Sequence, residues 1–162
     1  MDNMNKILLI GYGNPGRRDD GLGPGLIERL ECNPIPAVVL DADYQLTVEH
    51  AWDLSQYPMA IFADAAVSGA EPYFYQPLQP DAPISFSTHS VSPGAVLHMA
   101  REMFSATTQV YVLGIRGYEF EEIAEGLTER AQQNLDCAEA FIRQQLASGR
   151  LCDHTRSAVT DA

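Results

Sequence analysis

Two aspartates, Asp19 and Asp20, stand near the end of a glycine-rich stretch that follows the first apolar run of the chain. Residues 6–23 read KILLIGYGNPGRRDDGLG. Carboxylates act in proteins as metal ligands and general bases, and glycines let a loop bend so that a carboxylate can point into a cleft. The stretch therefore predicts a loop with a chemical function at the end of a strand.

The same stretch contains the pattern GxGxxG, at Gly11, Gly13 and Gly16, which is typical of dinucleotide-binding loops. In those loops a helix starts at the third glycine, and its amides hold the pyrophosphate. Here Pro24 predicts a later helix start, and two aspartates beside a pyrophosphate would cost about 1 kcal/mol or more per close pair of like charges. Asp41 and Asp43, at the end of the second expected strand, resemble the acidic residue that binds the ribose in dinucleotide-binding domains. A Rossmann dinucleotide-binding domain is therefore kept as a remote alternative.

Acidic residues also end two later apolar runs. Asp41 ends the run at residues 37–41, and Asp64 ends the run at residues 59–64. Functional groups gather at the carboxyl ends of parallel strands, so Asp20, Asp64 and Asp41 are expected to converge on one rim of a sheet.

A metal site at this rim would be completed by an imidazole, because carboxylates and one histidine suit nickel, zinc or cobalt. The chain has four histidines: His50, His89, His98 and His154. His154 lies in the C-terminal tail, whereas His50 and His98 fall within expected helices. His89 stands in the loop FSTHSVSPG, and loops held by a scaffold are where binding groups concentrate.

The apolar runs alternate with segments of helical periodicity. Strands are expected at residues 6–11, 37–41, 59–64, 72–77 and 109–114, and helices at residues 24–31, 47–54, 93–104 and 128–146. Thr47 and Thr128 are expected to cap the helices that they begin. This order predicts a single-domain α/β three-layer sandwich, with a mostly parallel twisted sheet of about five strands and helices on both faces. Residues 1–147 are expected to form the domain, and residues 148–162 a disordered tail.

The amino-acid composition limits the kinds of partner and metal site that are expected. The formal net charge of −12 disfavours nucleic acid and anionic membrane surfaces. The three cysteines form no CxxC pair, so a cysteine metal cluster is not expected. With no recognisable targeting or membrane-spanning segment, the protein is expected to act in the cytoplasm.

Three blocks of the sequence resemble the hydrogenase maturation endopeptidases, which trim the large subunit of nickel-iron hydrogenases. In chain order they are GYGNPGRRDDGLGP, IFADAAVSG and STHSVSPGAVL, and the resemblance extends over residues 6–146. The segment LDADYQLTVEHA further resembles the branch that serves cytoplasmic NAD-reducing or bidirectional hydrogenases.

This resemblance implies an aspartic-type endopeptidase that removes the C-terminal extension of the large-subunit precursor after nickel has been inserted there. The family's two acids and its histidine fall on Asp20, Asp64 and His89, as both metal-contacting and catalytic residues. Nickel would be supplied by the substrate, and the protease is expected to be a monomer. The alternatives are a nickel-delivery chaperone and a non-catalytic docking factor for the same precursor.

Asp19 is expected to hold the first loop through a local Asx-type turn, and Gln45 to face the same rim. The residues expected to shape the loop or to position substrate are Gly11, Gly13, Asn14, Asp19, Gly21, Gly23, Asp41 and Gln45.

Overall fold

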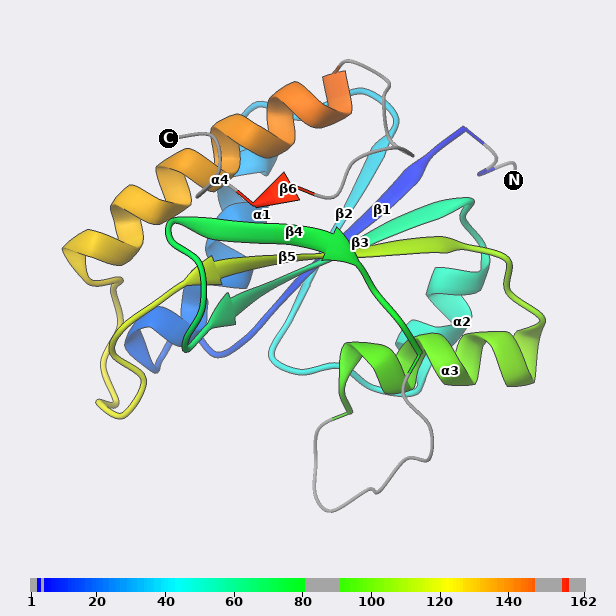
Figure 1. Cartoon of the computed structure of the whole chain (residues 1–162), viewed down its shortest axis with the longest axis horizontal. Coiled ribbons are helices and arrows are strands. Elements are labelled where there is room, and N and C mark those ends of the chain that lie inside the picture. The colour runs from blue at the N-terminus through cyan, green and yellow to red at the C-terminus, as the bar shows by residue number, and fades with distance from the viewer. Residues whose placement is uncertain (1–2, 4, 81–90, 148–155, 158–162) are drawn as a thin grey trace.

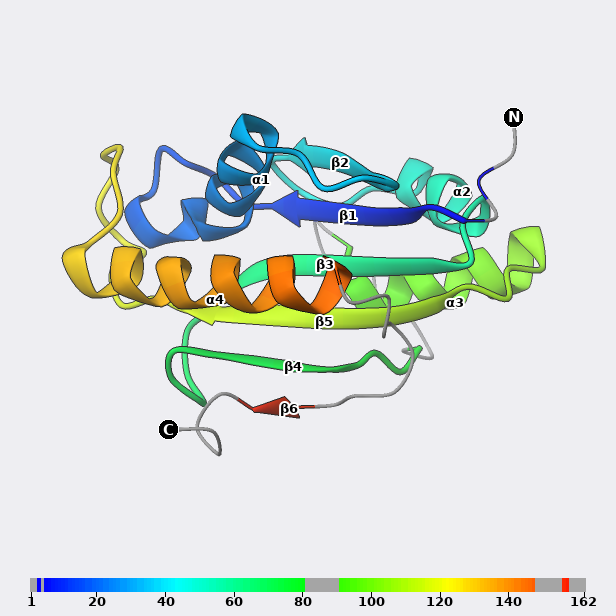
Figure 2. The same cartoon turned by 90° about the horizontal axis from the view of Figure 1, so that it is seen from above.

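A computed structural model of the chain describes residues 3, 5–80, 91–147 and 156–157. One sheet with the strand order β2-β1-β3-β5-β4-β6 lies between two layers of helices (Figure 1, Figure 2). Its strands are β1 (Ile7–Tyr12), β2 (Val38–Asp43), β3 (Met59–Ala66), β4 (Tyr73–Pro77), β5 (Gln109–Arg116) and β6 (Arg156–Ser157). The helices are the 3-10 turn η1 (Arg18–Gly21), α1 (Leu22–Cys32), α2 (Glu49–Ser55), α3 (Pro93–Phe104) and α4 (Glu129–Ala147). The predicted α/β sandwich is confirmed.

Strands β2, β1, β3 and β5 are parallel, whereas β4 runs antiparallel to β5 and β6 runs antiparallel to β4. The four parallel strands therefore end along one side of the sheet, which we call the carboxyl edge. In Figure 1 the arrowheads of β3 and β5 point toward it. Binding groups collect at such an edge because the loops after every parallel strand meet there.

Two apolar cores fill the space on either side of the sheet. Ile7 and Leu9 pack with α1 and α4, and the alternate residues Leu8 and Ile10 pack with α2 and α3. Both faces of the central strands are covered, which is why their sequences read as continuous apolar runs. In the described ranges, no helix has the length and apolar composition of a bilayer-spanning segment.

Three local features differ from the expectations. Helix α1 begins before the predicted Pro24, because η1 leads directly into it. Helix α2 begins at Glu49 and has no side-chain cap; the amide of Thr47 instead donates to Nδ1 of His50. Strand β6 lies within the segment predicted to be disordered, because it pairs with the outer edge of β4. The rest of that segment lies outside the described residues.

The start of α1 contacts the ends of β1 and β3 with no side chain between them. A Cβ atom on Gly23 would lie 2.5 Å from the carbonyl oxygen of Tyr12 and 2.6 Å from that of Ala63. A Cβ on Gly11 would lie 2.3 Å from the carbonyl oxygen of Gly23. This close approach requires glycine at both positions, and it brings η1 to the carboxyl edge.

Replacing Gly23 by alanine is expected to destabilise the fold by at least about 3 kcal/mol, because the new methyl group would overlap two backbone carbonyls. Gly25→Ala is the matched control in the same helix, since a Cβ there would meet only a side-chain carbon of Leu135 at 3.4 Å. Urea unfolding of both variants measures the difference. Equal stability of the two variants would contradict the close approach.

Candidate functional site at the carboxyl edge

Tyr12 and Asp64 lie side by side where β1 and β3 end. Gly11 pairs with Ala63 between these strands, so the following residues of both strands are neighbours on the same face. Asp43, the last residue of β2, pairs with Tyr12 from the other side. The three side chains form a row across the sheet on the face covered by α2 and α3, as side chains at matched positions of neighbouring strands do.

The carboxylate of Asp64 is held in a fixed orientation. Its Oδ2 accepts a 2.8 Å hydrogen bond from the hydroxyl of Tyr12, and its Oδ1 accepts a 2.7 Å bond from the amide of Ala65. Burial raises the pKa of Asp64 to about 6 against the opposing effect of these two donors, and the negative charge of Asp20 adds to the rise. The pKa of Tyr12 is raised by burial and by the neighbouring Asp64 carboxylate, so its hydroxyl stays a donor at neutral pH.

Asp20 reaches the same place from η1. Its Oδ2 accepts a 2.8 Å hydrogen bond from the amide of Asn14. Its negative charge adds to the raised pKa of both Asp64 and Tyr12. Two of the predicted site residues, Asp20 and Asp64, thus interact electrostatically at the carboxyl edge. Among the described residues no three His, Cys, Asp or Glu side chains are grouped to hold a metal ion.

The loop between β1 and η1 folds back on itself. Gly13 has a φ of 141°, and a Cβ there would lie 2.1 Å from the carbonyl oxygen of Asp20. A Cβ on Gly21 would lie 2.9 Å from the Cα of Pro15. The Oδ1 of Asn14 accepts from the amide of Gly16 at 2.8 Å. These contacts fix the shape of the loop that leads to Asp20.

This loop is not built as a phosphate cradle. Every backbone N–H from Gly13 to Asp20 donates to an oxygen of the protein itself. Gly16 is followed by η1 rather than opening a helix, and α1 begins only at Leu22. A dinucleotide site needs free amides at the helix start, so the geometry does not support the Rossmann alternative.

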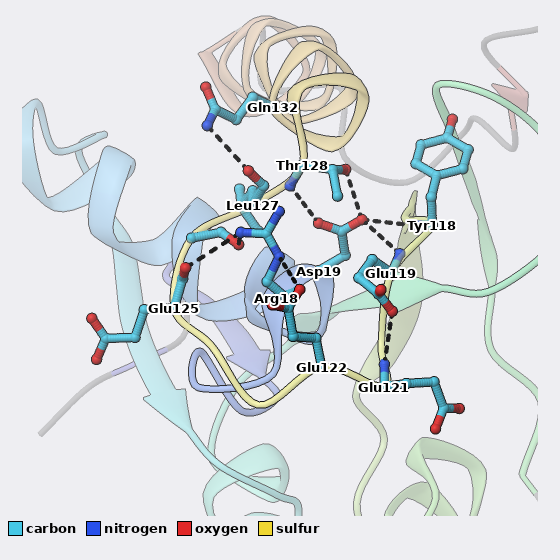
Figure 3. A network of polar contacts seen from close by, with 11 residues as sticks. Arg18, Asp19, Tyr118, Glu119, Glu121, Glu122, Glu125, Leu127, Thr128 and Gln132 are labelled. Atoms are coloured by element: carbon cyan, nitrogen blue, oxygen red, sulfur yellow. Dashed lines mark hydrogen bonds and ion pairs between the residues drawn. The ribbon is translucent and has the colours of Figure 1, made fainter.

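Asp19, next to Asp20, points the other way and is fully buried. Figure 3 shows its carboxylate accepting four hydrogen bonds, from the amides of Tyr118, Glu119 and Thr128 and from the hydroxyl of Thr128, at 2.8–3.0 Å. Asp19 does hold the loop, but the prediction of a local Asx-type turn is wrong. Its partners lie about a hundred positions away along the chain.

Thr128 connects this carboxylate to a helix. Its hydroxyl donates to Asp19 and accepts a 3.3 Å bond from the amide of Ala131 in the first turn of α4. Thr128 therefore caps α4, as its position in the sequence predicted. The loop of η1, the loop after β5 and the start of α4 meet at this one point.

Arg18 adds a second connection to the loop after β5. Its backbone has a φ of 52°, a region uncommon for residues other than glycine. Its amide donates to the carbonyl of Ala124 at 2.9 Å, and its guanidinium donates to the carbonyls of Glu125 and Gly126. These bonds hold the unfavourable conformation in place (Figure 3).

Asp41 does not join Asp20 and Asp64, contrary to expectation. It pairs with Ile10, two residues before the row that contains Tyr12, so it lies back from the edge. Nε2 of the buried His50 lies 3.8 Å from Asp41 and 3.6 Å from Asp43. Because Nδ1 of His50 accepts from a backbone amide, Nε2 carries the ring proton, so His50 has no free nitrogen for a metal.

His89, a further predicted site residue, lies outside the described residues, so its role stays a prediction. Gln45 is exposed in the connection after β2, and its neighbour Tyr44 is 71% exposed. Tyr12 was missed, because its place beside Asp64 depends on the pairing of β1 with β3, which the sequence does not state.

Solved structures with the same fold include three hydrogenase maturation proteases. The hydrogenase maturating endopeptidase HybD from E. coli matches with a TM-score of 0.71 at 20% identity, over 89% of this chain and 93% of that chain. The maturation protease HycI from Thermococcus kodakarensis KOD1 matches with a TM-score of 0.67 at 20% identity, over 86% and 91%. A hydrogenase 2 maturation peptidase from a Thaumarchaeota archaeon matches with a TM-score of 0.63 at 20% identity, over 87% and 97%.

Comparison of the sequence with protein-family models and with curated proteins finds no match. At about one identical residue in five, the structural likeness establishes the fold.

The pKa of Asp64 is expected to move in opposite directions in two variants. Tyr12→Phe removes a donor that stabilises the ionised carboxylate and raises the pKa above 6, whereas Asp20→Asn removes a neighbouring negative charge and lowers it. Carboxyl ¹³C chemical shifts followed against pH measure both changes. A pKa of Asp64 that is unchanged in Asp20→Asn would contradict the proximity of the two acids.

Asp19→Asn is expected to destabilise the protein by about 2–4 kcal/mol at pH 7, because an amide cannot accept all four hydrogen bonds. Burial would raise the pKa of Asp19, but the bonds from Thr128, Tyr118 and Glu119 outweigh it and lower the pKa below its ordinary value. The stabilisation is therefore complete above about pH 4 and is lost as the pH falls through the lower, folded-state pKa.

The measurement is chemical unfolding of wild type and Asp19→Asn between pH 3 and pH 7. The control is Asp136→Asn, which makes the same chemical change at an exposed ion pair with Arg29 and is expected to cost less than about 1 kcal/mol. A cost for Asp19→Asn that is no larger than that of the control would show that its hydrogen bonds do not hold the loop.

Proposed function

We propose that this chain, which has the fold of the hydrogenase maturation endopeptidases, removes the C-terminal extension of a nickel-iron hydrogenase large-subunit precursor. The observation that carries the proposal is the meeting of Asp20 and Asp64 at the carboxyl edge, with the pKa of Asp64 raised by burial to about 6. The three sequence blocks that resemble the family, and the solved structures of similar fold, support it.

The two carboxylates are suited to contact a nickel ion that the substrate already holds. Carboxylate oxygens are acceptable ligands for nickel, and two of them leave most coordination positions to other groups. His89, assigned by the sequence resemblance, would supply an imidazole from the segment before α3. In this arrangement the protease recognises the substrate's nickel without a resident metal of its own, so nickel insertion becomes the condition for cleavage.

Peptide cleavage requires a base that takes a proton from the attacking water. Asp64 is suited to this role because a carboxylate with a pKa of about 6 is ionised at neutral pH yet more basic than an ordinary aspartate. The water oxygen would add to the scissile carbonyl while Asp64 accepts its proton. The same proton would then pass to the leaving amine as the carbon–nitrogen bond breaks.

Asp20→Asn, Asp64→Asn and His89→Ala are each expected to slow processing of a nickel-loaded precursor by at least about 100-fold, because each removes one of few contacts to the reacting centre. Asp20→Asn is expected to change the free energy of unfolding by no more than about 1 kcal/mol, because Asp20 stands at the edge of the sheet. The rate is followed as the loss of mass of the precursor, with Asp136→Asn as the control.

The outcomes separate the alternatives. Wild-type rates in all three variants would show that the site is misplaced. An intact precursor with wild-type protein, together with tight binding of free nickel in calorimetry, would instead indicate a nickel-delivery chaperone. Binding of the precursor with neither cleavage nor nickel affinity would indicate a docking factor.

A further inference from the structure

Strand β2 forms one outer edge of the sheet, with β1 as its neighbour on one side and no strand on the other among the described residues. The amide of Ile7 donates to Ala37 and that of Gly13 donates to Asp43, so the odd-numbered residues of this strand face β1. Leu40 and Ala42 therefore turn their backbone N–H and C=O groups outward. Such an edge is a template for a further strand.

A first hollow, of about 280 Å³, lies at the end of this edge beside the site loop. We call it the rim hollow. It is lined by Gly13, Pro15, Pro24, Ala42, Asp43 and Tyr44. Its walls are mainly apolar carbon atoms, so it suits an apolar side chain.

A second hollow, of about 250 Å³, lies further back along β2. We call it the acidic hollow. Leu8 and Val39, which line it, belong to the core on the α2 side, whereas Pro24, which lines the rim hollow, belongs to α1 on the other face of the sheet. Its described lining residues include Asp41 and Asp53 but no Lys or Arg. It therefore suits a cationic side chain.

Several carboxylates lie close together in and beside the acidic hollow. Burial raises the pKa of Asp41; His50 and the backbone amide of Ala42 oppose this rise, whereas the charges of Asp53 and Asp43 add to it. Burial and the charges of Asp53 and Asp41 also raise the pKa of Tyr57 in the same lining. A lysine or arginine that entered would relieve this repulsion.

We propose that the outer edge of β2 binds an extended segment of the precursor as an added strand, with an apolar side chain in the rim hollow and a lysine or arginine in the acidic hollow. The inference rests on the proposed function, because the added strand belongs to the precursor. The hydrogen bond from the amide of Gly13 to the carbonyl of Asp43 joins this edge to the loop that carries Asp20. Successive side chains of a strand point to opposite faces. The sequence positions of the apolar and the cationic side chain in the precursor therefore differ by an odd number.

Backbone pairing is tested by hydrogen exchange at the amide of Leu40. In the presence of excess nickel-loaded precursor, exchange at this outward-facing amide is expected to slow by at least about tenfold, as for an amide that gains a strand partner. The amide of Leu9, which lies inside the sheet, serves as the reference that should not change. Unchanged exchange at Leu40 with bound precursor would overturn the proposal.

The charge pairing is tested by Asp53→Asn. This variant is expected to raise KM for the precursor by about threefold to tenfold with kcat unchanged, whereas Asp136→Asn on the opposite face leaves KM unchanged. If the acidic side chains serve only to keep sheets from pairing edge to edge, both variants will have the wild-type KM, and the proposal is wrong.

These readouts also separate this inference from the proposed function. Cleavage by wild-type protein with no slowing at Leu40 and no change of KM in Asp53→Asn overturns the added strand and leaves the protease. Slowed exchange at Leu40 in a mixture where the precursor stays intact supports the added strand and overturns the protease.

Discussion

The buried carboxylate of Asp19 is the constraint on which the site depends. It accepts four hydrogen bonds from the loop after β5 and from the start of α4. A buried charge is tolerated only where hydrogen bonds or opposite charges compensate it. Removing the Asp19 carboxylate would leave its hydrogen-bond donors without an acceptor. The loop that carries Asp20 is thereby fixed to two segments that are distant in the sequence, and Arg18 strengthens the same connection through carbonyls of residues 125 and 126.

Neighbouring aspartates serve different purposes because of the turn on which they stand. In a 3-10 helix successive residues are rotated by about 120°, so the side chains of Asp19 and Asp20 leave η1 in different directions. One carboxylate enters the interior and anchors the loop. The charge of the other, Asp20, adds to the rise that burial causes in the pKa of Asp64 near the end of β3. A single short turn thus supplies both the anchor and a functional group.

The sequence predicts well what is decided locally. Continuous apolar runs identified the covered strands, the helical periodicity identified α3 and α4 closely, and Thr128 was recognised as a cap. Asp20 and Asp64 could be predicted at one edge because Asp20 follows β1 and Asp64 lies near the end of the parallel strand β3. Local signals also showed that Pro24 lies near the start of α1, within a turn of its true beginning.

Features that depend on strand register or on contacts between distant parts of the chain could not be predicted from the sequence. Asp41 was expected at the rim, but the pairing of β2 with β1 places Asp43 in the row with Tyr12. The partners of Asp19 follow from the packing of three separate loops, which leaves no short-range pattern in the sequence. The orientation of the buried His50 depends on its acceptance of a hydrogen bond from the amide of Thr47, whereas the sequence predicted that Thr47 would cap α2.

The most direct test of the account is the intact mass of a nickel-iron hydrogenase large-subunit precursor before and after incubation with this protein, with and without nickel in the precursor. The account predicts that the nickel-loaded precursor loses its C-terminal extension and that the nickel-free precursor keeps its full mass. An unchanged mass of the nickel-loaded precursor would contradict the proposed activity. Equal cleavage of both forms would contradict the recognition of substrate nickel by Asp20 and Asp64.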